Sequence, residues 1–255
     1  MRILVTNDDG IDATGIKVLE GIARELSDDV WVVAPALDNS GVSHSLTLHE
    51  PLRHTQHGEK VFSIQGTPTD CVIMGVRKFL GSTPPDLVLS GINHGQNIAD
   101  DVTYSGTIAG AFEGSLLGIP SIAFSLATGI KSPQSMYWDT PKTQAASLIS
   151  TLVEGGISAD IPLNINFPDC TPEDVKGTLI TVQGKRDQGL LRIDSRLDPR
   201  GRDYFWFDFE RKLSNPAKGT DLWAVYNDYI SITPLHLNLT HHESCHALAQ
   251  KFNDV

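Results

Sequence analysis

Residues 3–10 read ILVTNDDG, a short apolar run that is followed by two acidic residues and a glycine. The run at residues 3–6 is rich in aliphatic and β-branched side chains and predicts a buried strand. Apolar residues then recur at helical spacing from residue 16 to residue 26, and a second β-branched run follows at residues 30–34. A strand, a polar turn, a helix and another strand in this order are typical of a parallel sheet.

The same alternation of strand-like runs and helical patterns continues as far as residue 166. We predict further strands at residues 61–65, 87–90, 121–125 and 162–166, and further helices at residues 67–79, 105–117 and 140–154. The sequence therefore predicts an α/β fold with three αβα layers, in which helices cover both faces of a mostly parallel, Rossmann-like sheet.

The pattern changes in the last third of the chain. Aromatic residues, turns and β-type runs dominate from about residue 179 to residue 240, and we predict a β-rich extension there, in the form of a hairpin or arm. A short helix is predicted at residues 243–252. Because no repeat or low-complexity linker interrupts the chain, we expect a single domain over residues 1–255.

Composition excludes several classes of protein. The 255 residues are 40% hydrophobic and 20% charged, and 31 acidic residues against 20 basic ones give a net charge of −11. Such an acidic chain is poorly suited to neutralise the phosphates of long nucleic acid. The three cysteines form neither a disulfide framework nor a zinc-knuckle spacing. The chain starts unlike a signal peptide and has no apolar stretch of transmembrane length, so we expect a cytoplasmic protein without a membrane partner.

Ligands of open parallel sheets bind at the carboxyl ends of the strands, and polar residues follow several predicted strands here. Asp8 and Asp9 follow the first strand, Ser40 lies in the loop after the second, and Asn93 follows the strand at residues 87–90. Adjacent carboxylates with further oxygen donors suit a divalent cation such as Mg²⁺ or Mn²⁺. When the Asp pair is taken alone, a turn or a helix cap explains it more readily than a metal ion does.

Ser105, Gly106 and Thr107 stand at the start of a predicted helix. Hydroxyl side chains beside glycine at a helix N-terminus form a ready site for a phosphate, although a plain N-cap accounts for the same residues. The three strand ends and this helix start together favour metal-assisted phosphate chemistry. The sequence contains neither a P-loop nor a dinucleotide-binding glycine motif, and it lacks the nucleophile motif of α/β-hydrolase esterases.

Taken together, these segments resemble the SurE family of metal-dependent 5′-nucleotidases. The resemblance is carried by ILVTNDDG at residues 3–10, NSGVSHSLT at 39–47, GTPTDC at 66–71, SGINHGQN at 90–97, YSGT at 104–107, DPRGRDY at 198–204 and SITPL at 231–235. The segments stand in the family's order over most of the chain, which is far more specific than any one motif.

The resemblance implies a function and a set of site residues. One divalent cation per subunit, Mg²⁺ or Mn²⁺, would be held by Asp8, Asp9, Ser40 and Asn93, with Asp8 and Asp9 in catalytic roles. The substrate phosphate would be bound by Asn97, Ser105, Gly106 and Thr107. The implied reaction converts nucleoside 5′-monophosphates to nucleosides and phosphate, with 3′-nucleotides and short polyphosphate as further substrates. Members of the family form homodimers or homotetramers.

Four alternatives stay open at this point. The chain could be a general phosphomonoesterase without nucleotide preference, or a phospho-metabolite sensor without catalysis. An aspartate rather than water could attack phosphorus, although two metal-binding aspartates favour water. The aromatic stretch at residues 204–207 predicts either contacts between subunits or a buried strand of the same chain.

Overall fold

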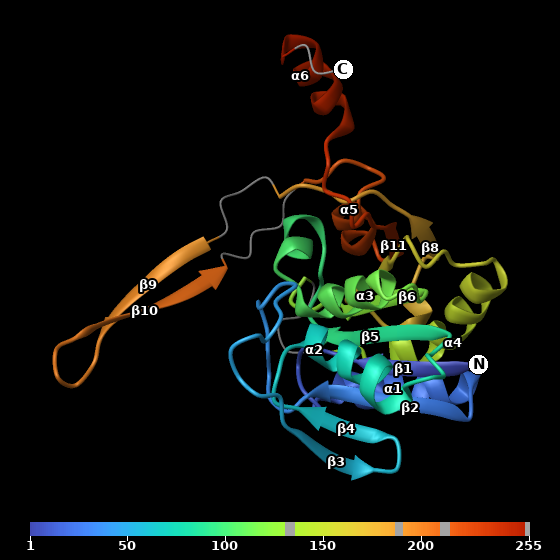
Figure 1. Cartoon of the computed structure of the whole chain (residues 1–255). Coiled ribbons are helices and arrows are strands. Elements are labelled where there is room, and N and C mark those ends of the chain that lie inside the picture. Colours follow the sequence, from blue (N-terminus) through green and yellow to red (C-terminus); the bar gives the residue numbers. More distant parts are fainter. Residues whose placement is uncertain (131–135, 187–190, 210–214, 253–255) are drawn as a thin grey trace.

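The structure, a computed structural model, describes residues 1–130, 136–186, 191–209 and 215–252 (Figure 1). A nine-stranded sheet with the order β3-β4-β2-β1-β5-β6-β7-β11-β8 forms its centre, and β9 and β10 form a separate two-stranded sheet. The strands are β1 (Arg2–Thr6), β2 (Asp29–Pro35), β3 (His54–Gly58), β4 (Val61–Ile64), β5 (Leu87–His94), β6 (Ser121–Leu126), β7 (Leu163–Phe167), β8 (Thr178–Ile180), β9 (Leu191–Leu197), β10 (Asp203–Phe209) and β11 (Ile230–Pro234).

Six consecutive strands of the large sheet, β4-β2-β1-β5-β6-β7, run parallel to their neighbours. In chain order these strands are the third, second, first, fourth, fifth and sixth of the set, which is the strand order of a doubly wound Rossmann fold. The β3–β4 and β7–β11 pairs are antiparallel. The predicted α/β class with a mostly parallel sheet is therefore confirmed.

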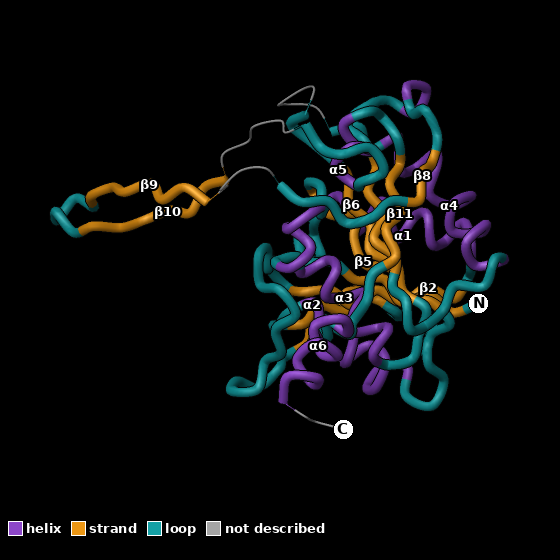
Figure 2. Tube along the Cα trace, turned by 90° about the horizontal axis from the view of Figure 1, so that it is seen from above, coloured by secondary structure: helices purple, strands orange, loops and turns teal. Residues whose placement is uncertain are grey.

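Helices cover both faces of this sheet. The helices are α1 (Thr14–Leu26), α2 (Pro68–Ile73), the π-helix η1 (Met74–Leu80), the 3-10 helix η2 (Ala99–Thr103), α3 (Gly106–Leu116), α4 (Asp139–Glu154), the 3-10 helix η3 (Pro172–Asp174), α5 (Asp221–Tyr226) and α6 (His242–Phe252). Helices α1 and α4 pack together on one face, and α2 and α3 pack together on the other (Figure 2). Among the described residues, no helix is both long and apolar enough to cross a bilayer.

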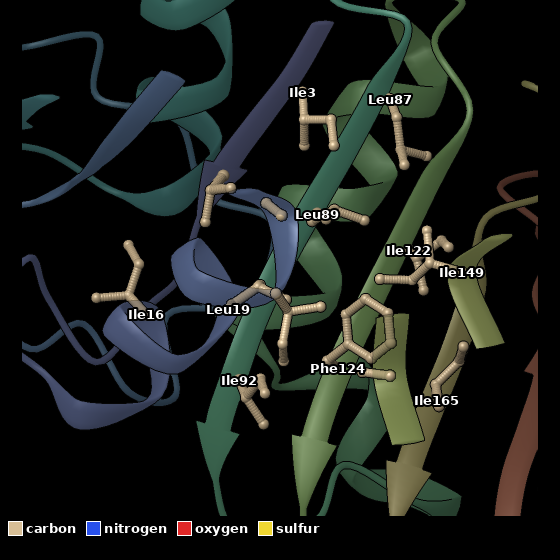
Figure 3. Close-up of a cluster of buried hydrophobic side chains, with 14 of the residues drawn as sticks. Ile3, Ile16, Leu19, Leu87, Leu89, Ile92, Ile122, Phe124, Ile149 and Ile165 are labelled. Carbon is tan, nitrogen blue, oxygen red and sulfur yellow. The ribbon is translucent and has the colours of Figure 1, made fainter. Parts of the chain in front are cut away.

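The core on the α1 side explains why the first apolar runs fold as they do. Ile16 and Leu19 of α1 lie one helical turn apart and pack with Leu89, Phe124 and other buried strand side chains (Figure 3). On the opposite face a second cluster joins the α2–η1 segment to β1, β2 and β4. Both faces of the central strands are therefore buried, as expected for near-continuous apolar runs in a parallel sheet.

The helix that was predicted to run from residue 67 to residue 79 is divided into two types of turn. Thr67 caps α2, and its hydroxyl accepts the N–H of Asp70 while the Asp70 carboxylate accepts the N–H of Thr67. This capping box, with Pro68 in the first turn, confirms the predicted start. From Met74 onward the chain continues as the π-helix η1, a change that the sequence pattern did not indicate.

The predicted β-rich extension at about residues 179–240 divides into two parts. β8 and β11 join the edge of the nine-stranded sheet, whereas β9 and β10 form a hairpin that projects away from it (Figure 1). Helix α5 also lies in this region and was not predicted. The residues 187–190 and 210–214 of the predicted extension lie outside the described residues.

Candidate active site

The sequence-predicted residues of the site meet where the strand order reverses. Going outward from β1, the chain order of the parallel strands rises on both sides, so the gap between β1 and β5 is the topological switch point of the sheet. Asp8 and Asp9 directly follow β1, and Asn93 lies at the end of β5. The connectivity of the fold therefore places these residues in the crevice where such sheets bind ligands.

Helix α3 packs closely against this crevice because glycine recurs on its sheet-facing side. A Cβ atom at Gly106 would lie 2.8 Å from the Cβ of Asp8, and one at Gly110 would lie 2.6 Å from Ser90 Oγ. Gly114 faces Ser121 and Val88 in the same way. The absence of three side chains allows the backbone at the start of α3 to pack directly against Asp8.

Asp8, Asn93 and Thr107 form one contact cluster. The Thr107 hydroxyl hydrogen-bonds Asp8 Oδ1, and the same Oγ1 lies 3.3 Å from Asn93 Oδ1. A hydroxyl has a single proton, so it satisfies one of these two acceptor oxygens at a time. The side-chain oxygens of Asp8, Asn93 and Thr107 therefore converge at this point.

The surroundings of Asp8 and Asp9 raise the pKa values of both carboxyl groups. Burial raises the pKa of Asp8 to about 7, and the charge of Asp9 adds to this increase, while the Thr107 hydrogen bond opposes it. Burial also raises the pKa of Asp9, which is less deeply placed and accepts the main-chain N–H of His94 at 3.1 Å. Two partly desolvated carboxylates side by side require positive charge nearby if both are to be ionised.

Ser40 lies near this cluster without a hydrogen bond to it. Its hydroxyl and its main-chain N–H donate to Asp38 Oδ1, at 2.6 and 2.8 Å. The loop itself is attached to the site, because the N–H of Asn39 donates to the carbonyl oxygen of Asp8 at 2.8 Å. Within the described residues, no hydrogen bond joins Ser40 to Asp8, Asp9 or Asn93. The structure therefore places Ser40 beside the cluster and brings in Asp38, whose charge also raises the pKa of Asp9.

The start of α3 has features of both predicted alternatives, the plain N-cap and the phosphate site. Ser105 is the N-cap, and its hydroxyl accepts the N–H of Ile108 at 3.1 Å, so its side chain does serve as a cap. The main-chain N–H of Thr107 hydrogen-bonds the Asp8 carboxylate, whereas within the described part of the chain the N–H of Gly106 donates to no acceptor, as expected for the first turn of a helix. The Gly106 donor lies next to Asp8 and is available to an anion.

Asn97 is placed by contacts with neighbouring strands and not by α3. Its main-chain N–H donates to Asn166 Oδ1 at 2.9 Å, and its side-chain amide lies 2.9 Å from Ser125 Oγ. Ser125 is the register partner of Asn93 on the adjacent strand, so Asn97 lies about one strand away from the Asp8 cluster.

Comparison with known proteins identifies the family. The sequence model of the family described as Survival protein SurE matches residues 3–189. A 5′-nucleotidase SurE from Methylorubrum extorquens strain PA1 is 58% identical over 240 residues, which cover 94% of each chain. The chain belongs to the SurE family. A 5′-nucleotidase SurE from Bradyrhizobium diazoefficiens is 55% identical over 250 residues, which cover 97% of this chain and 98% of that protein.

A solved structure of the SurE family has the same fold. The crystal structure of the SurE protein from Aquifex aeolicus matches with a TM-score of 0.85 and 40% sequence identity, covering 98% of this chain and 99% of that one. The likeness thus extends over nearly the whole chain and is not confined to the sheet.

Several polar residues beside this SurE-family site were not predicted from the sequence. They are Asp38, Ser125, Asn164 and Asn166, and the last three are fully buried. A signal was present for two of them, because Asn164 and Asn166 alternate with apolar residues in the predicted strand at residues 162–166. Amides on one face of a buried strand need hydrogen-bond partners, and those partners proved to be the loop that carries Asn97.

Proposed function

We propose that this chain is a 5′-nucleotidase that releases phosphate from nucleoside 5′-monophosphates. The observation that carries the proposal is the cluster at the β1–β5 switch point, where carboxylate and amide oxygens converge beside the free N–H of Gly106 at the start of α3. The names of relatives that are 55–58% identical over nearly the full chain support the nucleotide substrate.

A divalent cation fits the oxygens of this cluster. The described residues contain no group of three or more His, Cys, Asp or Glu side chains that could hold a metal ion, so carboxylates alone do not make the site. Asp8, Asp9 and Asn93, completed by Ser40 of the adjoining loop, offer the oxygen donors that Mg²⁺ and Mn²⁺ prefer. Such an ion would offset the charge of the two carboxylates and supply Lewis-acid stabilisation to phosphoryl oxygens.

Groups of the protein itself bind the phosphate, hold Asp8 in place and orient the attacking water. The N–H of Gly106 binds a phosphoryl oxygen at the positive end of the α3 dipole, where negative charge grows during phosphoryl transfer. Thr107 holds the Asp8 carboxylate in place through its hydroxyl. Asp9, which is less buried than Asp8, orients the attacking water as a hydrogen-bond acceptor. Asp8 and Asp9 are the proposed catalytic residues.

A panel of substrates and metals tests the proposed function. With Mg²⁺ or Mn²⁺, the purified protein is expected to release phosphate from AMP with a kcat/KM at least about tenfold above that for p-nitrophenyl phosphate, a selectivity of about 1.4 kcal/mol. The panel includes 3′-AMP and tripolyphosphate as the further substrates. Equal kcat/KM for the two monoesters would support the general phosphomonoesterase, and the absence of phosphate release from every substrate would support the sensor.

We also propose that the chain forms a homodimer or homotetramer through the β9–β10 hairpin. Phe205, Trp206 and Phe207 of β10 are 61%, 60% and 70% exposed, so the alternative of a buried strand in the same chain is wrong. Successive residues point to opposite faces of a strand, and both faces of the hairpin therefore present aromatic side chains. Exposed apolar surface of this kind marks an interaction site. A cytoplasmic location and the absence of membrane and long nucleic-acid partners remain part of the proposal.

Light scattering tests the assembly. The wild-type protein is expected to have the mass of at least a dimer at micromolar concentration. Replacing Phe205 and Phe207, which share one face of β10, by serine should lower the mass without a large change in melting temperature, because both side chains contact solvent in the single chain. A monomeric wild-type protein would contradict this proposal.

A further inference from the structure

A cluster of buried amides holds the Asn97 peptide from both sides. The Asn97 carbonyl oxygen accepts Nδ2 of Asn164 at 2.8 Å and Nδ2 of Asn166 at 3.2 Å, and its N–H donates to Asn166 Oδ1 at 2.9 Å. Asn166 Nδ2 also donates to Asn164 Oδ1 at 3.1 Å. Both asparagines lie on β7 and are fully buried, so the loop that follows β5 is fixed by a strand two positions away in the sheet.

The orientations of the Asn164 and Asn166 amides follow from these contacts. A main-chain N–H can only donate, and a main-chain carbonyl oxygen can only accept. Asn166 must therefore turn its oxygen to the Asn97 N–H, and both asparagines must turn their nitrogens to the Asn97 carbonyl oxygen.

The Asn97 side chain is different, because its one partner is a hydroxyl. The structure places Asn97 Nδ2 2.9 Å from Ser125 Oγ, but a hydroxyl can donate to an amide oxygen at this position as well as accept from an amide nitrogen. Nitrogen and oxygen of an amide are distinguished only through the hydrogen-bond network around them. Geometry alone therefore permits two orientations of Asn97 that differ by a half-turn of its amide.

The proton of Ser125 decides between the two orientations. Ser125 is fully buried, and within the described residues its hydroxyl has no hydrogen-bond partner other than the Asn97 amide. If Asn97 donated to Ser125, the buried hydroxyl proton would be left without an acceptor, which is costly. If Ser125 donates to Asn97 Oδ1 instead, this proton is satisfied. The Asn97 NH₂ group then takes the outward position. The side-chain atom of Asn97 at that position does not belong to the buried, unpaired atoms of the described residues.

We propose that Ser125 is a positioning residue that turns the NH₂ group of Asn97 outward, where it donates to a phosphoryl oxygen of the substrate. This inference rests on the proposed function, since it assigns a role within the same phosphate site. It also gives Asn164 and Asn166 a role, because they hold the Asn97 peptide at the position from which this donation is made.

The Ser125→Ala variant tests the inference, with inorganic phosphate as the probe. We expect its dissociation constant for inorganic phosphate, measured by calorimetry in the presence of Mg²⁺, to rise about two- to tenfold. Ser121→Ala is the matched control, because Ser121 lies on the same strand, is equally buried and donates to the carbonyl oxygen of Ile119, away from Asn97. The control variant should bind phosphate like the wild type.

Two further variants separate positioning from a general loss of structure. Asn97→Ala should raise the dissociation constant by at least about tenfold, because a hydrogen bond to a charged group is lost. In that background, adding Ser125→Ala should change the constant less than about twofold, since Ser125 acts through Asn97. Asn97→Asp keeps the shape but replaces the donor by a charged acceptor, and it should weaken phosphate binding at least as strongly as Asn97→Ala.

Several outcomes would overturn the inference. These are wild-type phosphate affinity in Ser125→Ala, multiplicative effects in the double variant, retained affinity in Asn97→Asp, or a wild-type protein that binds no phosphate. Release of phosphate from AMP by the wild type is measured alongside. Hydrolysis by the wild type with unchanged binding in Ser125→Ala would refute this inference and leave the proposed function standing.

Discussion

Asp8→Asn and Asp9→Asn are each expected to reduce the turnover of AMP by at least about a hundredfold. Loss of a residue that merely supports a metal ligand typically costs ten- to a hundredfold in affinity or activity, and these two residues are proposed as ligands themselves. Asparagine keeps the shape of aspartate, and its Oδ1 can still accept the Thr107 hydrogen bond, so the charge is the main property that changes.

The measurement is steady-state phosphate release at saturating Mg²⁺ or Mn²⁺, with and without a chelator. The wild-type protein should lose activity in excess EDTA and regain it when either ion is restored. Full activity in the presence of EDTA, or near-wild-type turnover of both variants, would contradict the proposed metal site.

The Asp8→Asn variant should at the same time stabilise the metal-free protein. The folded-state pKa of Asp8 is raised from 3.8 to about 7 by burial, so ionisation favours the unfolded chain increasingly between about pH 4 and pH 7. Asparagine removes this penalty. The melting temperature of the metal-free variant should therefore exceed that of the wild type by several degrees at pH 8 and by much less near pH 4. This gain also shows that lost turnover does not come from a damaged fold.

Gly106→Val is expected to have the second-largest effect. The added Cβ would lie 2.8 Å from Asp8 Cβ and 3.0 Å from Asp8 Oδ2, closer than nonbonded carbon atoms approach. Either Asp8 or the start of α3 must move, and both belong to the proposed site. We expect turnover to fall about a hundredfold or more, and the inhibition constant for inorganic phosphate to rise about tenfold.

Gly21→Ala provides the matched control, because Gly21 also lies in a helix but a Cβ there would meet nothing within 4 Å. This variant should retain activity and gain slight stability, since alanine favours helix over glycine. Inhibition by phosphate and melting temperature are measured on both variants. A lowered melting temperature with unchanged phosphate inhibition in Gly106→Val would mean that the phosphate pocket lies elsewhere.

The sheet could be predicted from the sequence because each central strand carries its own apolar run. The meeting of Asp8 with Asn93 then follows from the general rule that ligands of open parallel sheets bind at the carboxyl ends of the strands. Local patterns indicate less about β8 and β11, which are short and separated by the hairpin, so their place in the main sheet depends on long-range pairing. Helix α5 spans Asp221–Tyr226 and is too short to show a helical period.

Within the site, the sequence indicated the polar residues that directly follow predicted strands, such as Asp8 and Asn93, and those that begin a predicted helix, such as Ser105. It did not indicate that the Asn97 loop is held by β7, because that contact joins positions 69 residues apart. It also did not indicate that Gly106 makes room for Asp8 in addition to a phosphate, because this depends on how closely α3 approaches β1. Both features come from packing between elements, which no single motif encodes.

The position of β11 in the sheet has a consequence for synthesis of the chain. β11 spans Ile230–Pro234 and fills the place between β7 and β8, and β8 pairs with β11 in the described sheet. As the chain leaves the ribosome, β7 therefore has one open edge, and β8 has no partner strand, until residues 230–234 have been synthesised. An open strand edge recruits other strands, including those of neighbouring nascent chains. Chains that terminate before residue 230 should for this reason aggregate, even though the residues of the proposed catalytic centre are already present.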